Sequence, residues 1–210
     1  QEKILRELWQ REIDILVGTQ MITKGHDFPF ITLVGVVAAD TVLNMPDFRA
    51  AERAFQQLTQ VAGRGGRGDS PGRVIIQTFN PQHYALKHVQ KNDYQSFYEE
   101  EISYRKELKY PPSGRIINLR LSATNKDKLL AQSEKLGKTA RKLAARQGNV
   151  VETIGPAQAP LAKIKGRWRR QMLLKSESIN ALHQLARELI ASMEKGPVKL
   201  TVDVDAENFM

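Results

Sequence analysis

Cysteine is absent from the 210 residues of this chain. A disulfide framework, a zinc site with thiolate ligands and a cysteine nucleophile are therefore excluded within it. No apolar run approaches the roughly 18 residues that a membrane-spanning helix needs, and the first dozen residues are charged rather than signal-like. The lack of a membrane-spanning run and of a signal-like N-terminus predicts a protein of the cytoplasm with no membrane partner.

Two signatures of nucleotide hydrolysis are also missing. The sequence holds no Gly-x-x-x-x-Gly-Lys-Ser/Thr loop to cradle phosphates and no Asp-Glu-x-His run to hold magnesium. Its four histidines are scattered without metal-ligand spacing, so we predict no metal site in this chain. The chain begins with Gln1 inside an amphipathic pattern, which we interpret as a piece cut from a longer protein.

Charge is plentiful but unevenly spread. The net charge is +9, yet residues 1–114 hold 14 basic and 14 acidic side chains, whereas residues 115–210 hold 18 and 9. This asymmetry indicates two units with different partners. A polyanion is the natural partner for the second unit.

The first part of the chain alternates short apolar runs with helical patterns. The runs cover residues 14–17, 32–39 and 73–79. They are rich in Val, Ile and Leu, which is typical of buried parallel strands. Between the last two, residues 47–61 place apolar side chains on one helical face, and Asp47 is positioned to cap that helix. Strands joined by crossover helices predict an α/β unit over residues 1–110.

The second part is set apart by a helix stop. A helical stretch over residues 92–109 ends at Pro111-Pro112-Ser113-Gly114, where we place the domain boundary. The pattern beyond it is strand, helix, strand, strand, helix, strand, over residues 115–123, 125–146, 150–155, 168–176, 178–194 and 199–205. This order predicts a ferredoxin-like (βαββαβ) α+β domain over residues 115–210.

The most informative segment is Gln60-Val61-Ala62-Gly63-Arg64-Gly65-Gly66-Arg67-Gly68, at the end of the predicted 47–61 helix. Arginines three apart on a helix share a face, and their guanidinium groups match phosphate oxygens. A second polar segment, residues 18–29, directly follows a predicted strand, where ligands gather in open α/β sheets. A basic turn and an ordinary loop are the alternative interpretations of the two segments taken singly.

Together the two segments resemble the fifth and sixth motifs of superfamily 2 helicases, in the second RecA-like lobe. Gly25-His26-Asp27 matches that family's Gly-x-Asp, and residues 60–67 match its Gln-x-x-Gly-Arg-x-Gly-Arg. The resemblance implies that Arg67 is the arginine finger on the γ-phosphate and Arg64 a second phosphate contact or an organiser of the interface. It likewise implies that Gln60, Gly25, Asp27 and Gly63 belong to the nucleotide site. The first lobe is missing, so this chain alone is expected to be inactive.

Further segments make the resemblance more specific. Besides those two motifs, they are PDFRAAER at residues 46–53, Pro111-Pro112 and GRWRR at residues 166–170. With them, nearly the whole chain resembles the C-terminal portion of the primosomal replication-restart helicases. The resemblance implies an ATP-dependent 3'-to-5' DNA helicase that recognises stalled or branched replication forks and restarts replication by primosome assembly. It also implies that Thr19, Gln20 and Thr23 couple the nucleotide state to the DNA strand.

The same resemblance implies cofactors, partners and a location. ATP and Mg²⁺ would need the missing first lobe, and Zn²⁺ would be held by cysteines upstream of this segment. Expected partners are branched and single-stranded DNA, single-stranded DNA-binding protein and other primosome proteins. The expected location is the bacterial cytoplasm, in association with the nucleoid.

A basic segment in the second unit is the predicted DNA contact. It consists of Lys163, Lys165, Arg167, Trp168, Arg169 and Arg170, and no acidic residue occurs between Glu152 and Glu177. Arginine beside an aromatic ring offers phosphate contacts and base stacking together. Strand alternation, however, puts Arg167 and Arg169 on one face and Trp168 and Arg170 on the other. Either the whole segment binds DNA, or Trp168 packs on the sheet and only arginines bind.

Two other functions stay open at this point. The second unit could be a non-catalytic nucleic-acid-binding module, although its predicted strands 115–123 and 199–205 lack the aromatics of an RNA-recognition sheet. The whole could instead belong to another superfamily 2 fork-remodelling translocase. That alternative requires the PDFRAAER and GRWRR segments to be coincidental.

Overall fold

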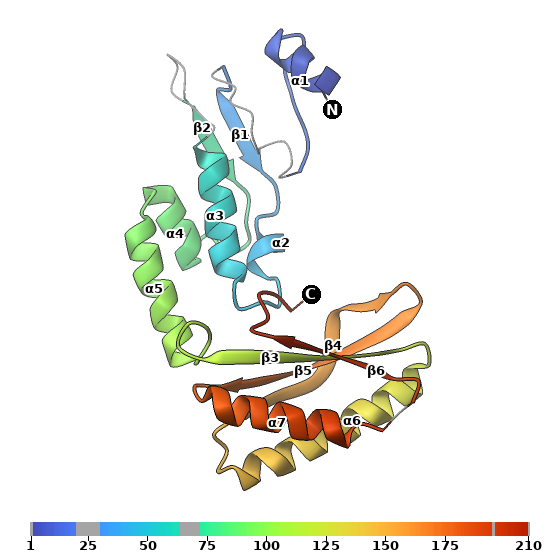
Figure 1. Cartoon of the computed structure of the whole chain (residues 1–210). Coiled ribbons are helices and arrows are strands. Elements are labelled where there is room, and N and C mark those ends of the chain that lie inside the picture. Colours follow the sequence, from blue (N-terminus) through green and yellow to red (C-terminus); the bar gives the residue numbers. More distant parts are fainter. Residues whose placement is uncertain (1, 20–29, 64–71, 195, 210) are drawn as a thin grey trace. The chain divides into compact units, whose positions relative to one another are not determined.

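The computed structural model describes residues 2–19, 30–63, 72–194 and 196–209. The chain divides into two compact units (Figure 1). Unit 1 comprises residues 1–45 and 49–98, and unit 2 comprises residues 46–48 and 99–210. Within the described ranges, no helix is both long and apolar enough to cross a membrane.

Unit 1 is built around a pair of parallel strands, β1 (Leu33–Val36) and β2 (Arg73–Ile76). Parallel neighbours need a crossover connection, and here it contains α2 (Asp40–Leu43) and α3 (Ala50–Ala62). One side of α3 packs into an apolar cluster, led by Phe55, whose ring stacks on that of Phe97 at 4.1 Å. A parallel sheet with a covering helix is therefore present, as the apolar runs predict.

Two details in the first half of the chain differ from the sequence predictions. Residues 14–17 form no strand, because they pair with neither β1 nor β2, and Ile15 and Val17 stay exposed. Asp47 is not the N-cap residue of α3: the helix begins at Ala50, and Arg49 is its N-cap. The Arg49 guanidinium instead pairs with Glu52 in the first turn, at 2.8 Å.

The helices that follow β2 also differ from prediction. The predicted single helix over residues 92–109 is preceded by a helix that the pattern did not reveal, α4 (Tyr84–Lys91). Asn92 ends α4 in the left-handed region, at φ 50°, which amide side chains tolerate. The Asp93 carboxylate then accepts a hydrogen bond from the Ser96 N–H at 3.0 Å and starts α5 (Tyr94–Glu107). A short helix, α1 (Glu2–Trp9), opens the chain.

Unit 2 has the predicted strand–helix–strand–strand–helix–strand order. Its elements are β3 (Arg115–Ala123), α6 (Lys126–Arg146), β4 (Glu152–Ile164), β5 (Arg167–Ser176), α7 (Ile179–Ser192) and β6 (Lys199–Val204). The strands form one antiparallel sheet in the order β4-β5-β3-β6. β4 is longer than predicted, because after two register shifts its last residues pair with the start of β5.

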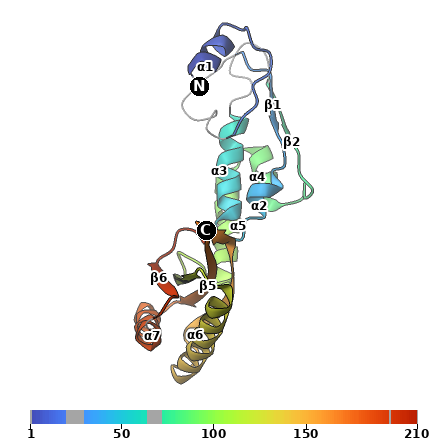
Figure 2. The same cartoon turned by 90° about the vertical axis from the view of Figure 1, so that its right-hand side faces the viewer.

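The main core of unit 2 lies between the sheet and its two helices. Figures 1 and 2 show α6 and α7 together on one face of the sheet. Leu119, Leu121 and Leu174 point from the strands into this core, where they meet apolar side chains of both helices such as Leu185. Side chains alternate between the two faces along β3, so Ile116 of this strand lies on the opposite face. There a second cluster joins Ile116 and Leu173 to Ala206 and Phe209, with Phe48 and Tyr110 packed against it.

Candidate nucleic-acid interface

The predicted nucleotide-site residues fall only partly within the described structure. Gln60 is exposed on the last turn of α3. Gly63 caps that helix, and its N–H donates to the Thr59 carbonyl at 2.9 Å. Thr19 is exposed outside regular structure. The remaining residues of both motifs lie outside the described residues: Gln20, Thr23, Gly25, Asp27, Arg64 and Arg67. Their roles stay predictions.

Asp40 lies at the carboxyl end of the two parallel strands and holds the loop there. Sequence reasoning did not single out this residue. Its carboxylate accepts from the Thr78 hydroxyl and from the Phe79 N–H, each at 3.0 Å. Burial alone would raise the pKa of Asp40, but these hydrogen bonds outweigh it and hold the pKa below its ordinary value. The loop after β2 is thereby fixed, while the Phe79 ring is 96% exposed. The position of Asp40, directly after an apolar run, is the sequence signal that could have identified it.

The predicted DNA-contact segment forms a tight hairpin. Lys165 and Gly166 connect β4 to β5, with φ of 47° and 77°. A two-residue turn with both φ values positive matches the twist of the strands it joins. Lys163 and Lys165 are exposed beside this turn.

Trp168 faces the helices. It packs against the main core of unit 2 and stands opposite Ala123 on β3 and Lys163 on β4. The Lys126 Nζ lies 5.0 Å and the Lys163 Nζ 4.8 Å from the centre of its ring. Two ammonium groups thus lie over the ring that would otherwise stack on a base.

Arg170 lies on the same face as Trp168 and is held within the protein. Its Nη2 donates to the Glu134 carboxylate of α6 and to the Pro156 carbonyl, both at 2.8 Å. An arginine held by an ion pair and a backbone carbonyl ties α6 to the two strands of the hairpin. This geometry gives Arg170 a structural part in unit 2.

Arg167 and Arg169 point to the opposite face, as strand alternation predicts. The Arg167 Nη2 donates to the Ser122 carbonyl at 2.8 Å, and its Nε to the Ser122 hydroxyl at 3.3 Å. Arg169 stands directly opposite Ser122 in the β3–β5 ladder. It has no ion pair or side-chain hydrogen bond with any described residue. The four predicted contact residues on β5 are therefore divided between the two faces of the sheet.

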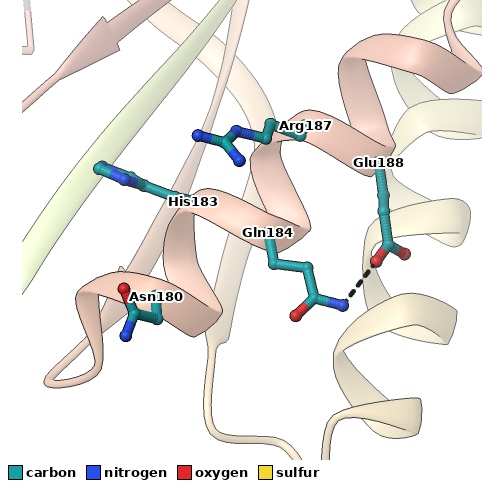
Figure 3. A pocket seen from close by; sticks show the side chains of 5 residues that line it. All are labelled: Asn180, His183, Gln184, Arg187 and Glu188. Carbon is teal, nitrogen blue, oxygen red and sulfur yellow. Dashed lines mark hydrogen bonds between the residues drawn. The ribbon is translucent and has the colours of Figure 1, made fainter.

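The surface of α7 carries a separate polar group. Figure 3 shows Asn180, His183, Gln184, Arg187 and Glu188 around a shallow depression. The Gln184 amide donates to the Glu188 carboxylate at 3.0 Å. Across the described ranges, no cluster of three or more His, Cys, Asp or Glu side chains could hold a metal ion.

Comparisons with known proteins identify relatives of this chain. Residues 106–207 match the family model described as the primosomal protein N C-terminal domain. The chain is 40% identical over 208 residues to the replication restart protein PriA of Bacillus subtilis, covering 97% of this chain and 26% of that protein. The chain belongs to the PriA family. It is 43% identical to PriA of Synechocystis over 96% of its length, and 40% identical to PriA of Treponema pallidum over 93%.

The extent of these matches is informative. The chain spans about a quarter of the length of the PriA proteins that it matches, 24% to 29% for these three. The PriA family model covers most of unit 2, from the end of α5 onward, whereas similarity to the PriA sequences extends through unit 1 as well. Among solved structures, the designed protein Foldit4 covers 45% of the chain at 12% identity with a TM-score of 0.35, too weak to bear on the fold.

Proposed function

We propose that this chain is the C-terminal part of an ATP-dependent 3'-to-5' DNA helicase that recognises stalled or branched forks and restarts replication by primosome assembly. The observation that carries the proposal is the 40% identity to a replication restart protein over 97% of the chain. The positive charge of residues 115–210 supports it, because a basic surface suits a polyanion.

Unit 1 then contributes to ATP hydrolysis as part of the second RecA-like lobe. Support comes from the parallel pair β1 and β2 and from α3, which leads directly into the Gly63–Gly68 arginine motif. Arg67 would neutralise charge on the departing phosphoryl group, with Arg64 as a second phosphate contact. Gln60 and Gly63, at the end of α3, and Gly25 and Asp27 would complete the nucleotide side of this lobe. ATP and Mg²⁺ would bind against a first lobe that this sequence does not contain.

Unit 2 would grip DNA, and other parts of the complete protein would supply the rest. Thr19, Gln20 and Thr23 would couple the nucleotide state to the DNA strand. The proposed partners are branched and single-stranded DNA, single-stranded DNA-binding protein and other primosome proteins. Zn²⁺ would be bound outside this chain, and the site of action would be the nucleoid in the bacterial cytoplasm.

The experiment is Arg67→Ala in the complete protein. Loss of an arginine finger is expected to lower DNA-stimulated ATP hydrolysis by about 10³-fold, while DNA binding is retained. Arg6→Ala, on the exposed surface of α1, removes the same charge elsewhere and is expected to leave hydrolysis unchanged. Near-normal hydrolysis by Arg67→Ala would overturn the role assigned to this arginine.

A further inference from the structure

The face of the four-stranded sheet that α6 and α7 leave uncovered has two dissimilar ends; we call it the open face. One end is covered by the aromatic cluster of Phe48, Tyr110 and Phe209. The other end lies at the β4–β5 hairpin, where Arg167, Arg169 and Lys199 alternate onto the open face. This second end therefore offers cationic side chains to a ligand.

Three cations converge there on one small residue, and we call this set the Ser122 row. In the ladder, Ser122 of β3 stands between Arg169 of β5 and Lys199 of β6. Arg167 reaches the same serine through its guanidinium, at 2.8 Å from the backbone carbonyl. Adjacent strands lie about 4.8 Å apart, so the two outer cations straddle a short side chain at a separation of about 10 Å. Their long, flexible stems can close on a ligand above the serine.

The charge of the Ser122 row is not neutralised within the sheet. Two acidic residues further along the open face already pair with basic neighbours: Asp203 with Arg120 at 2.7 Å and Glu152 with Lys175 at 2.9 Å. Neither Arg169 nor Lys199 forms an ion pair with any residue that the structure describes. Clustered like charges repel one another, which an anionic partner would relieve.

We infer that, resting on the DNA-binding role proposed above, the Ser122 row is where unit 2 holds the sugar–phosphate backbone of DNA. Trp168 and Arg170 lie on the other face and stabilise the hairpin instead. The strand residues at this end of the open face include no aromatic side chain that could stack on a base. The contact is therefore with phosphates, independent of base sequence. The Arg167 guanidinium has five N–H donors, so it can hold Ser122 and a phosphate together.

The test compares charge-matched variants of the 210-residue chain on a model DNA fork at several salt concentrations. Arg169→Gln and Lys199→Gln are each expected to weaken binding by about 10-fold at 50 mM salt. Each should lower the slope of log affinity against log salt by about 1. Arg170→Gln removes the same charge from the adjacent residue of β5, and Lys142→Gln removes it from the exposed surface of α6. Both controls should change fork binding by less than 2-fold.

Each outcome decides between the alternatives. Equal weakening by Arg169→Gln and Lys142→Gln would overturn the assignment, because only total charge would then matter. A loss with Arg170→Gln that exceeds the loss with Arg169→Gln, in variants with the same circular dichroism spectrum, would place the contact on the helix-covered face. Failure of the unchanged chain to bind any DNA would instead overturn the proposed DNA-binding function of unit 2. If Arg169→Gln failed to fold, the Lys199→Gln result would decide.

Discussion

The two units bury their strands in different ways. In unit 2, β3 is almost continuously buried, and Leu119 and Leu121 are 0% exposed between the sheet and its helices. In unit 1, only one face of the β1–β2 sheet is covered, and Leu33 and Ile75 on the other face are 57% and 53% exposed. Parallel sheets are normally covered on both faces, and a sheet of two strands is marginal alone. We therefore expect unit 2 to be the more stable unit of this chain.

The largest expected effect breaks the core of unit 2. Leu119→Ala should lower the free energy of unfolding of that unit by about 3 kcal/mol, since it removes fully buried methyl groups. Leu33→Ala, on the exposed face of β1, should cost less than about 0.5 kcal/mol. The chain has one tryptophan in each unit, Trp9 and Trp168, so urea unfolding followed in Trp9→Phe and Trp168→Phe backgrounds separates them. Equal shifts for both substitutions would contradict the comparison.

A smaller expected effect tests where along α5 unit 1 ends and unit 2 begins. α5 contributes Phe97 to the cluster of unit 1, but its later residue Glu101 pairs with Arg105 at 2.7 Å within unit 2. Glu101→Gln should destabilise unit 2 by about 2 kcal/mol, because it weakens a charged hydrogen bond that is nearly buried.

The readout is the urea midpoint seen by Trp168, with Trp9 as the internal comparison. Glu107→Gln, exposed at the end of the same helix, is the matched control and should leave both midpoints unchanged. A shift confined to the Trp9 signal would assign this part of α5 to unit 1.

The smallest effect concerns pH and unit 1. The folded-state pKa of Asp40 lies below its ordinary value of 3.8, so the hydrogen bonds to Thr78 and Phe79 stabilise unit 1 above that pH. This contribution is lost as pH falls through the lowered pKa. In an NMR titration, the Phe79 amide should shift with a midpoint below 3.8. Asp40→Asn should abolish that shift, whereas Asp14→Asn should leave it. A midpoint above 3.8 would contradict the assignment.

Local pattern predicted unit 2 better than unit 1, for physical reasons. The 3.6-residue periods of α6 and α7 report burial directly, because one stripe of each helix packs into the complete core of unit 2. In unit 1, α4 escaped notice because it is only two turns long, and residues 14–17 resembled a strand but have no described neighbour to pair with.

The candidate interface shows the same limit. Alternation along β5 separates Arg167 and Arg169 from Trp168 and Arg170, because the face of a strand residue follows from its position in the sequence. Lys199 could not be added to the arginines from sequence, because only the sheet order brings β6 beside β3. Asp40 is similar, since its hydrogen-bonding partners lie 38 and 39 residues away along the chain.

The assignment of Pro46–Phe48 to unit 2 has a consequence for proteolysis of the protein. The chain passes between the units three times, after Met45, after Phe48 and after Tyr98. Residues 49–98 are therefore joined to unit 2 at both ends. One proteolytic cut near Tyr98 divides the chain into residues 1–98 and 99–210, which no disulfide links. The first fragment still carries Pro46–Phe48, and the Phe48 ring contacts the rings of Tyr110 and Phe209 in the second fragment. Digestion products of the native protein should thus stay together until denaturant is added.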